Sequence, residues 1–305
     1  MDTLFTPYGL LAALALLATL LVAGLWCRLR KVPYGAWIRL CAAGIPLAWV
    51  CSRVTFCLAT LPTYIAQGPE LMLHFWEGGG SMFGAFGGLL LAAWLTARRQ
   101  GVKPAVLLDA VGLGAPLGVI IERIAESTVE GMGWGEAVMS DWLLPISVES
   151  YGSYWHAVYR YEAIATGVIL LALIGWLIAR KGHIVEGDLL LVFMTLYGCA
   201  QVVLESLRDD GHMVVHHFVH ISQIVAILLP AAALLVWTLR LAKKGTKKSH
   251  VIVPWLITAA CIGVGIAQEF AVDHSENLYI DYSIMAAAMV IVAVTALVIR
   301  RRANR

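Results

Sequence analysis

Long runs of apolar residues alternate with short polar segments along this chain. Most runs have the roughly 20 residues that a helix needs to cross about 30 Å of hydrocarbon. The third run is interrupted by the glycine-rich stretch GGGSMFGAFGG, and the fourth contains Asp109 and three glycines. The pattern therefore predicts about nine membrane-spanning helices, with eight as the alternative. The nine runs cover residues 7–28, 36–61, 80–97, 105–122, 156–179, 187–206, 217–241, 251–270 and 281–299.

The composition supports this interpretation. The 305 residues are 60% hydrophobic and 14% charged, with a mean hydropathy of +0.79, whereas a soluble domain is about half apolar and a quarter charged. We therefore expect an all-α polytopic integral membrane protein. The six cysteines lie inside predicted spans without a metal-binding spacing, which indicates small packing residues. Neither a nucleic-acid partner nor a cofactor is expected.

The basic residues predict the orientation. By position, 17 of the 22 Lys and Arg residues follow odd-numbered spans, and cytoplasmic loops are the ones that carry such residues. Of the 20 acidic residues, only Asp109, Glu186 and Asp188 fall in the inner half. We expect the N-terminus outside and the C-terminus in the cytoplasm. The start, MDTLFTPYGLL, lacks the basic region of a secretory signal peptide.

The chain divides into two predicted parts. Residues 1–241 form a functional core with a long outer loop at 123–155, and residues 250–305 form an additional C-terminal transmembrane hairpin. Two pairs of glycines with small-xxx-small spacing, Gly84–Gly88 and Gly114–Gly118, predict close helix packing in lipid.

Five arginines remain outside the basic loops: Arg39, Arg53, Arg123, Arg160 and Arg208. Arg39 lies near the inner end of its span and can reach the membrane surface. An arginine at membrane depth costs at least about 2.5 kcal/mol, so the other four need partners or a cavity. The candidate partners at the same level are Glu126, Glu130, Glu162 and Glu205.

Two interpretations fit these arginines. Buried ion pairs would fix the register of neighbouring helices. Alternatively, the guanidinium groups would bind the phosphate of a phospholipid headgroup, because their paired N–H donors match phosphate oxygens.

Four segments carry a resemblance to a known family. They are HFWEGGGSMFGAFGGLLL, DAVGLGAPLGVIIERIAESTVEGMGWGEA, HAVYRYE and YGCAQVVLESLRDD. Their order and spacing over roughly residues 8–240 resemble those of the prolipoprotein diacylglyceryl transferases of bacterial inner membranes. The resemblance implies a multi-pass protein of that membrane. Its partners would be phosphatidylglycerol, other membrane lipids and the lipobox peptide of a preprolipoprotein.

The resemblance also implies an activity. Enzymes of this family move diacylglycerol from phosphatidylglycerol to a lipobox cysteine thiol at the outer leaflet, and glycerol phosphate leaves. Arg123 would bind the phosphate and act with Glu205, Arg208, His156 and Glu162 as the catalytic candidates. The substrate-binding candidates are Arg123, Gln201, Tyr197, Gly87, Gly88, Glu126, Gly135, Arg53 and Arg160.

This sequence departs from the family pattern at polar positions. Phe86 replaces a histidine, Glu126 an asparagine and Gln201 an arginine. Arg53 and Arg160 are the candidates that could supply the missing charge. The departures keep a second hypothesis open, namely a phospholipid-binding relative with altered catalysis, or a transferase with another acceptor.

The stretch RDDGHMVVHHFVH is the last unusual segment. If it were helical, three histidines would share one face near Asp209, which would suit a divalent metal. A membrane metal-binding protein is therefore a further alternative. The favoured interpretation is a set of polar aromatic residues at the interface before the seventh span. The weak metal candidates are His212, His216, His220 and Asp209.

Overall fold

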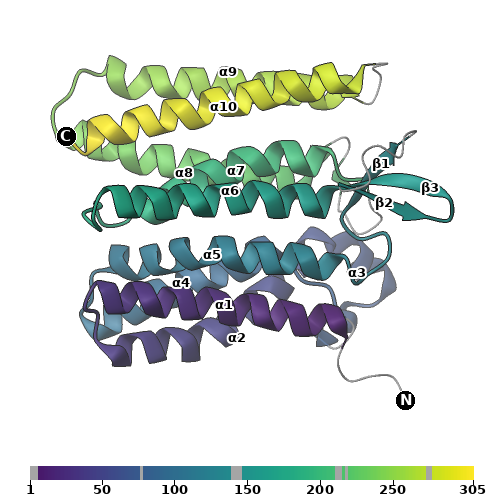
Figure 1. Cartoon of the computed structure of the whole chain (residues 1–305), viewed down its shortest axis with the longest axis horizontal. Coiled ribbons are helices and arrows are strands. Elements are labelled where there is room, and N and C mark those ends of the chain that lie inside the picture. Colours follow the sequence, from purple (N-terminus) through teal and green to yellow (C-terminus); the bar gives the residue numbers. More distant parts are fainter. Residues whose placement is uncertain (1–5, 76–77, 139–145, 210–214, 217–218, 273–276) are drawn as a thin grey trace.

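The computed structural model shows a bundle of long helices that run side by side (Figure 1). It describes residues 6–75, 78–138, 146–209, 215–216, 219–272 and 277–305. The long helices of this described part are α1 (Pro7–Leu29), α2 (Tyr34–Ala59), α4 (Met82–Gln100), α5 (Pro104–Glu126), α6 (Val158–Ala179), α7 (Asp188–Ser206), α8 (Ile221–Lys243), α9 (Ser249–Val272) and α10 (Leu278–Ala303).

The long helices coincide with the nine predicted runs. Within the described ranges, eight of them are long and apolar enough to cross a membrane, and α4 is not among the eight. This helix contains the glycine-rich third run, which was the uncertain one at the level of sequence. The all-α polytopic architecture is thus confirmed.

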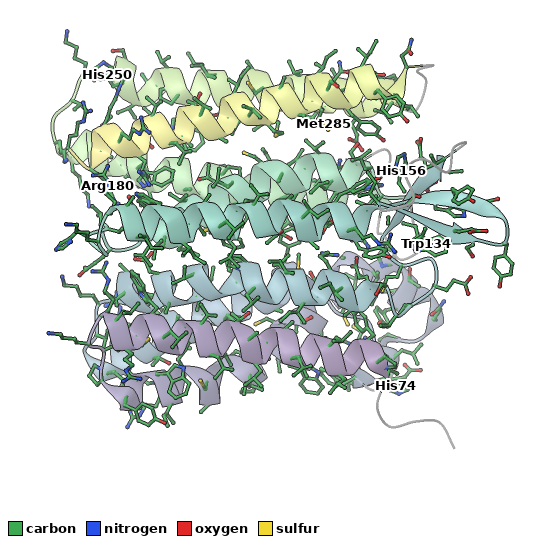
Figure 2. The ribbon with its side chains drawn as sticks, in the orientation of Figure 1. His74, Trp134, His156, Arg180, His250 and Met285 are labelled. Atoms are coloured by element: carbon green, nitrogen blue, oxygen red, sulfur yellow. The ribbon has the colours of Figure 1, made fainter. Side chains whose placement is uncertain are left out.

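The two ends of the bundle differ. A small sheet lies at one end, which we call the sheet end, and α10 finishes at the opposite end (Figure 1). Arg180 and His250 lie at that opposite end, which we call the basic end (Figure 2). The predicted orientation places the sheet end outside the cell, and this assignment stays a prediction.

Short elements form the sheet end. Strand β3 is the centre of a three-stranded antiparallel sheet in the order β1-β3-β2, and β4 pairs with β5. A short helix and a 3-10 turn connect α2 to α4. These elements are α3 (Leu61–Gln67), η1 (Pro69–Leu73), β1 (Trp134–Val138), β2 (Ser147–Ser150), β3 (Ser153–Ala157), β4 (Val215–His216) and β5 (Val219–His220).

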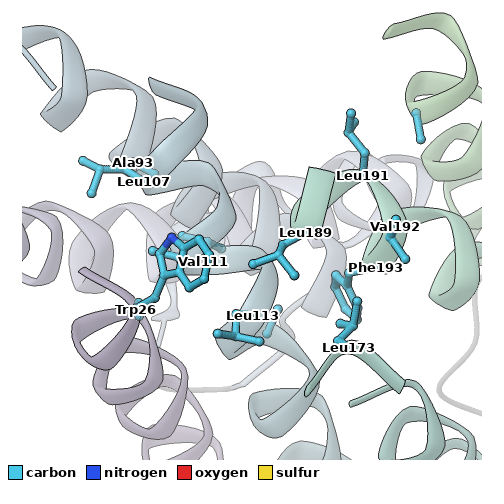
Figure 3. Close-up of a cluster of buried hydrophobic side chains, with 14 of the residues drawn as sticks. Trp26, Ala93, Leu107, Val111, Leu113, Leu173, Leu189, Leu191, Val192 and Phe193 are labelled. Atoms are coloured by element: carbon cyan, nitrogen blue, oxygen red, sulfur yellow. The ribbon is translucent and has the colours of Figure 1, made fainter. Parts of the chain in front are cut away.

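The apolar core lies between the central helices. Trp26 of α1, Leu107 of α5 and Phe193 of α7 are almost completely buried in one cluster, part of which is seen in Figure 3. On the outside of the bundle the pattern is reversed, since Leu25 is 61% and Leu171 is 70% exposed. Large apolar side chains that face outward fit a bundle surrounded by lipid.

Glycines allow two helix pairs to approach closely. A Cβ at Gly88 of α4 would collide with the backbone of Leu47 on α2. A Cβ at Gly114 of α5 would collide in the same way with Thr19 on α1. Both contacts confirm the packing predicted from the small-xxx-small spacing.

The C-terminal hairpin, α9 with α10, is attached to the core at both ends. Gln223 Nε2 of α8 donates to Glu269 Oε2 at 2.9 Å, and Tyr282 donates to the carbonyl oxygen of Ser206 at 3.2 Å. At the basic end, Asn304 Nδ2 donates to Asp188 Oδ2 at 2.5 Å. The division of the chain at residue 241 remains a prediction.

Candidate functional site

Arg123 is the centre of a buried ion-pair cluster at the sheet end. Its side chain, on the last turn of α5, is 4% exposed. Its Nε lies 2.5 Å from Glu162 Oε2 and 3.3 Å from Glu122 Oε2, and its Nη1 donates to Glu126. Its Nη2 lies 3.2 Å from the sulfur of Met82. The arginine therefore contacts α4, α5 and α6 at once.

Arg208 is the second cation of the cluster. Its Nη1 lies 3.5 Å from Glu126 Oε1 and 3.9 Å from Glu162 Oε1. Burial alone would lower the pKa of Arg208, but the nearby carboxylates of Glu126 and Glu205 outweigh this effect, so the pKa is raised. Both arginines thus share the same two carboxylates.

The backbone at the sheet end explains why these residues meet. Gly135 of β1 forms a bridge with Arg208, and Asp209 N donates to the carbonyl oxygen of Trp134 at 3.0 Å. Strand β3 leads directly into α6, so Glu162 lies on the first turns of that helix. Gly133 has φ +71°, and a Cβ there would touch Glu126. The loop after α5 can therefore fold back over the cluster only with glycine at this position.

Glu205 extends the cluster along α7. Gln201 Nε2 and Ser222 Oγ each donate to one of its carboxylate oxygens at 2.8 Å. The ring of His220 lies 2.7 Å from the carbonyl oxygen of Glu205. Gln201 is fully buried, so the neutral amide that replaces the family arginine is used to hold a carboxylate.

Carboxyl groups outnumber arginines in the described part of the cluster. Two arginines, Arg123 and Arg208, lie among four carboxylates: Glu122, Glu126, Glu162 and Glu205. Within the described residues, the buried oxygens Glu126 Oε2 and Glu162 Oε1 accept no hydrogen bond, and the short contact of Glu162 Oε2 is its ion pair with Arg123. Buried polar atoms normally have partners, and atoms that lack them are typical of sites that bind or transfer something. The excess of carboxylates suits proton exchange, and the arginines suit an anion.

The structure brings most of the predicted site residues together. Tyr197 belongs to the same group, because its hydroxyl lies 3.8 Å from the sulfur of Met82, which also contacts Arg123. Together the cluster contains Arg123, Glu126, Gly135, Glu162, Tyr197, Gln201, Glu205 and Arg208.

Arg53 is used elsewhere. Its guanidinium donates to carbonyl oxygens between residues 71 and 79, with distances of 2.9 Å to Leu71 and 3.1 Å to His74. The segment that contains η1 is thus fastened to α2 by one buried arginine. With its donors used in this way, Arg53 holds the loop in place.

Other predicted residues also lie apart from the cluster contacts. Arg160 Nη1 donates to the carbonyl oxygen of Ser147 on β2 at 2.9 Å. His156 Nδ1 lies 2.7 Å from the Tyr161 hydroxyl, and burial lowers the pKa of this histidine. Gly87 faces open space, whereas Gly88 packs on α2.

The helix considered for the histidine run is not formed in its described residues. Val215–His216 pairs with Val219–His220 as an antiparallel hairpin, so His216 and His220 do not follow a helical i, i+4 spacing. His212 lies outside the described residues. Among the described residues, no group of three His, Cys, Asp or Glu side chains could hold a metal ion. The metal-binding alternative therefore gains no support.

Three further residues of the cluster are not among the predicted site residues. Glu122 pairs with Arg123 and accepts a hydrogen bond from Tyr8 at 3.1 Å, while Ser222 holds Glu205. Glu122 was visible as the neighbour of Arg123 in sequence. Tyr8 and Ser222 come from distant helices, and no sequence spacing connects them to the cluster.

Fold and site together define a polytopic membrane protein with an arginine–carboxylate centre at one membrane face. The sequence model of the prolipoprotein diacylglyceryl transferases matches residues 4–239, and the chain belongs to this family. The replacements at Phe86, Glu126 and Gln201 stay what the resemblance implies. Phe86 packs edge-on against Phe193 with ring centroids 5.8 Å apart.

Individual relatives agree with the family match. The chain is 26% identical over 247 residues to the phosphatidylglycerol–prolipoprotein diacylglyceryl transferase of Bacillus licheniformis, covering 75% of this chain and 87% of that protein. It is 25% identical over 246 residues to the enzyme of that name from Halalkalibacterium halodurans, covering 77% and 82%. The enzyme of that name from Rhodospirillum centenum is 33% identical over 164 residues, covering 52% and 57%.

Proposed function

We propose that this protein transfers the diacylglyceryl group of phosphatidylglycerol to a cysteine thiol of a prolipoprotein. The family match and the names of the relatives support the reaction and both substrates. We further propose that the thiol belongs to a lipobox peptide, and that the reaction takes place at the outer face of a bacterial inner membrane. The sheet end would be this outer face, because the basic loops gather at the other end.

The two buried arginines would bind the phosphate of the lipid. Arg123 and Arg208 both pair with Glu126 and Glu162. An incoming phosphate would replace these carboxylates as the acceptor of the arginine N–H groups. A guanidinium offers two parallel donors to a phosphate, and this geometry matters in a site without bulk water. Charge that builds up on the phosphate as it leaves would be stabilised by the same donors.

The carboxylates would accept the thiol proton. In the proposed step the sulfur forms a bond to the terminal glyceryl carbon while the bond from that carbon to the phosphate oxygen breaks. The electron pair of the broken bond leaves with glycerol phosphate. The proton of the thiol passes to a carboxylate of the cluster. Glu162 is the first choice because its buried Oε1 accepts no hydrogen bond from the described residues.

Gln201 sets a limit on this mechanism. It donates to Glu205 and carries no charge, so phosphate binding would depend on Arg123 and Arg208 alone. We infer that the surviving pair is sufficient, because both arginines are buried at the junction of α5, α6 and α7. The shared contact of the two arginines with Glu126 and Glu162 is the observation that carries the proposal.

A turnover assay tests the proposal. Purified protein receives phosphatidylglycerol and a lipobox-cysteine peptide, and released glycerol phosphate is measured. We expect release that requires the peptide, loss of at least about 100-fold in Arg123→Ala, and partial activity in Arg123→Lys, which keeps charge but not the paired donors. Arg98→Ala, an exposed arginine at the basic end, is the control and should match the wild type.

Two outcomes would contradict the proposal. Full turnover in Arg123→Ala would exclude this arginine from the reaction. Phosphatidylglycerol binding without peptide-dependent release would favour a lipid-binding relative or a transferase with another acceptor.

A further inference from the structure

A groove on the side of the bundle lies near the basic end, far from the ion-pair cluster. Its floor is formed by α7, including Leu196, and its walls by Trp176 of α6 and Leu297 of α10. The groove has a volume of about 210 Å³ and opens to the outside of the bundle, where Ala172 is exposed. Apart from two arginines at one end, the side chains that line it are apolar.

The two arginines, Arg300 and Arg301, belong to the last turn of α10. The guanidinium carbon of Arg300 lies 4.2 Å from the ring centroid of Trp176, which holds this cation at the wall of the groove. Arg180 is close enough to interact electrostatically with Arg300 and lies at the same end of the bundle (Figure 2). Three like charges therefore gather where the apolar groove meets the membrane surface.

Nearby carboxylates do not neutralise this charge. Asp188 lies 3.9 Å from Arg300 Nε, but its oxygens are already used by Arg240 at 2.7 Å and by Asn304 at 2.5 Å. In the described part of the chain, Arg300 Nε donates no hydrogen bond although it is buried. A buried donor without an acceptor beside a positive surface leaves a place for an anion.

We propose that this groove binds an anionic phospholipid of the leaflet at the basic end. The phosphate would contact Arg300 and Arg301, and one acyl chain would lie along the groove between α6 and α10. Charge complementarity selects an anionic headgroup, since cationic side chains at the membrane surface attract acidic lipids. An apolar channel that continues from the arginines toward the middle of the bilayer selects a lipid over a soluble phosphate.

The inferred lipid is distinct from the proposed substrate. The family match ends at residue 239, whereas one wall of the groove and both arginines belong to α10. The site thus exists only because the C-terminal hairpin packs beside α6 and α7. It would give the hairpin a purpose, namely to fix a lipid at the leaflet opposite to the chemistry.

Native mass spectrometry of the full chain in detergent tests this proposal. Phosphatidylglycerol and phosphatidylcholine with identical acyl chains are titrated, and the lipid-bound fractions are compared. We expect the wild type to hold one more phosphatidylglycerol than Arg300→Gln/Arg301→Gln, whose affinity for that lipid should fall about 10- to 30-fold. Arg302→Gln/Arg305→Gln removes the same two positive charges from exposed neighbours that do not line the groove, and should bind as the wild type.

A second variant separates the groove from the charge. Ala172→Trp keeps all arginines and places an indole where the acyl chain would lie, so it should also lose the additional lipid. Thermal unfolding checks that each variant is folded. Equal loss in Arg302→Gln/Arg305→Gln, equal binding of phosphatidylcholine, or undiminished binding in both groove variants would overturn the proposal.

Discussion

The two ends of the bundle use buried charge in opposite ways. At the sheet end, four carboxylates lie around Arg123 and Arg208, and some of their buried oxygens accept no hydrogen bond from the described residues. At the basic end, the carboxylate of Asp188 accepts hydrogen bonds from Trp237 at 3.1 Å, Arg240 and Asn304. Among the described residues, the cluster at the sheet end thus has buried carboxylate oxygens without a donor, whereas the basic end has a buried donor, Arg300 Nε, without an acceptor.

This difference distinguishes a structural cluster from the cluster proposed to carry the reaction. A buried carboxylate with all its partners fixes helices in place, and Asp188 joins α7 to α8 and α10 in this way. Asp109 is similar, since it accepts from the backbone N–H groups of Gly187 and Leu190 where α7 begins. Glu162 differs, because it forms ion pairs with Arg123 and Arg208 while its Oε1 accepts no hydrogen bond from the described residues. Buried groups left incomplete are costly, and the sheet end keeps them where substrate and proton would supply the remaining contacts.

Among the changes that test this comparison of the two ends, Glu162→Gln is expected to have the largest effect, which is a loss of turnover. The amide has almost the same shape but cannot accept the thiol proton, and loss of a general base typically costs about 100-fold or more in rate. Measurement of kcat for glycerol phosphate release should show the loss while phosphatidylglycerol binding is retained.

Glu130→Gln is the matched control for this change. Glu130 is exposed at the same end and only accepts a hydrogen bond from Ser150 at 3.1 Å. A kcat of Glu162→Gln equal to that of this control would show that the incomplete carboxylate has no part in the chemistry.

A smaller effect, on stability and not on chemistry, is expected for Asp188→Ala. Breaking a buried ion pair costs about 3–5 kcal/mol, and the partial exposure of Arg240, 28%, puts the loss near the lower limit. The Tm in detergent should fall, while turnover per folded molecule at low temperature should stay close to that of the wild type. If turnover fell as steeply as with Glu162→Gln, the contrast between the two ends would be lost.

The smallest effect concerns His156 and pH. Burial lowers its pKa, so the folded state binds fewer protons than the unfolded state near the ordinary pKa of histidine. The contribution of His156 to stability is therefore present above about pH 6.5 and decreases as the pH falls below it. Thermal unfolding of the wild type and of His156→Gln is measured at pH 7.5 and 5.5. The Tm of the wild type relative to that of the variant should be lower at pH 5.5 than at pH 7.5. A difference independent of pH would contradict this.

The sequence predicted the helices well because lipid imposes a simple rule on length and polarity. The arginines at membrane depth also indicated where the ion-pair cluster lies, since Arg123 and Arg208 needed carboxylate partners at the sheet end. The partner of each arginine was harder to predict from the sequence. Arg53 donates hydrogen bonds to backbone carbonyl groups of a loop, and such acceptors cannot be predicted from the pattern of side chains in the sequence.

The sheet end shows the same limit. Glycine and aromatic residues between 131 and 157 gave no strand pattern, yet they form the sheet that fixes Arg208 beside Glu126. Two-residue strands such as β4 and β5 are determined by tertiary contacts, so the histidine run was open to a helical interpretation.

The pairing of Arg208 with Glu126 also constrains the biogenesis of the protein. These partners are 82 residues apart, so α5 reaches the membrane well before α7 has been synthesised. At the usual 5–20 residues per second this interval lasts roughly 4–16 seconds. Throughout that time Arg208 is not yet available to pair with Glu126, so the charged end of α5 must stay at the aqueous surface. Assembly of the ion-pair cluster is therefore a late event, completed only when α7 is inserted and the residues that follow it, Arg208 and Asp209, dock on β1.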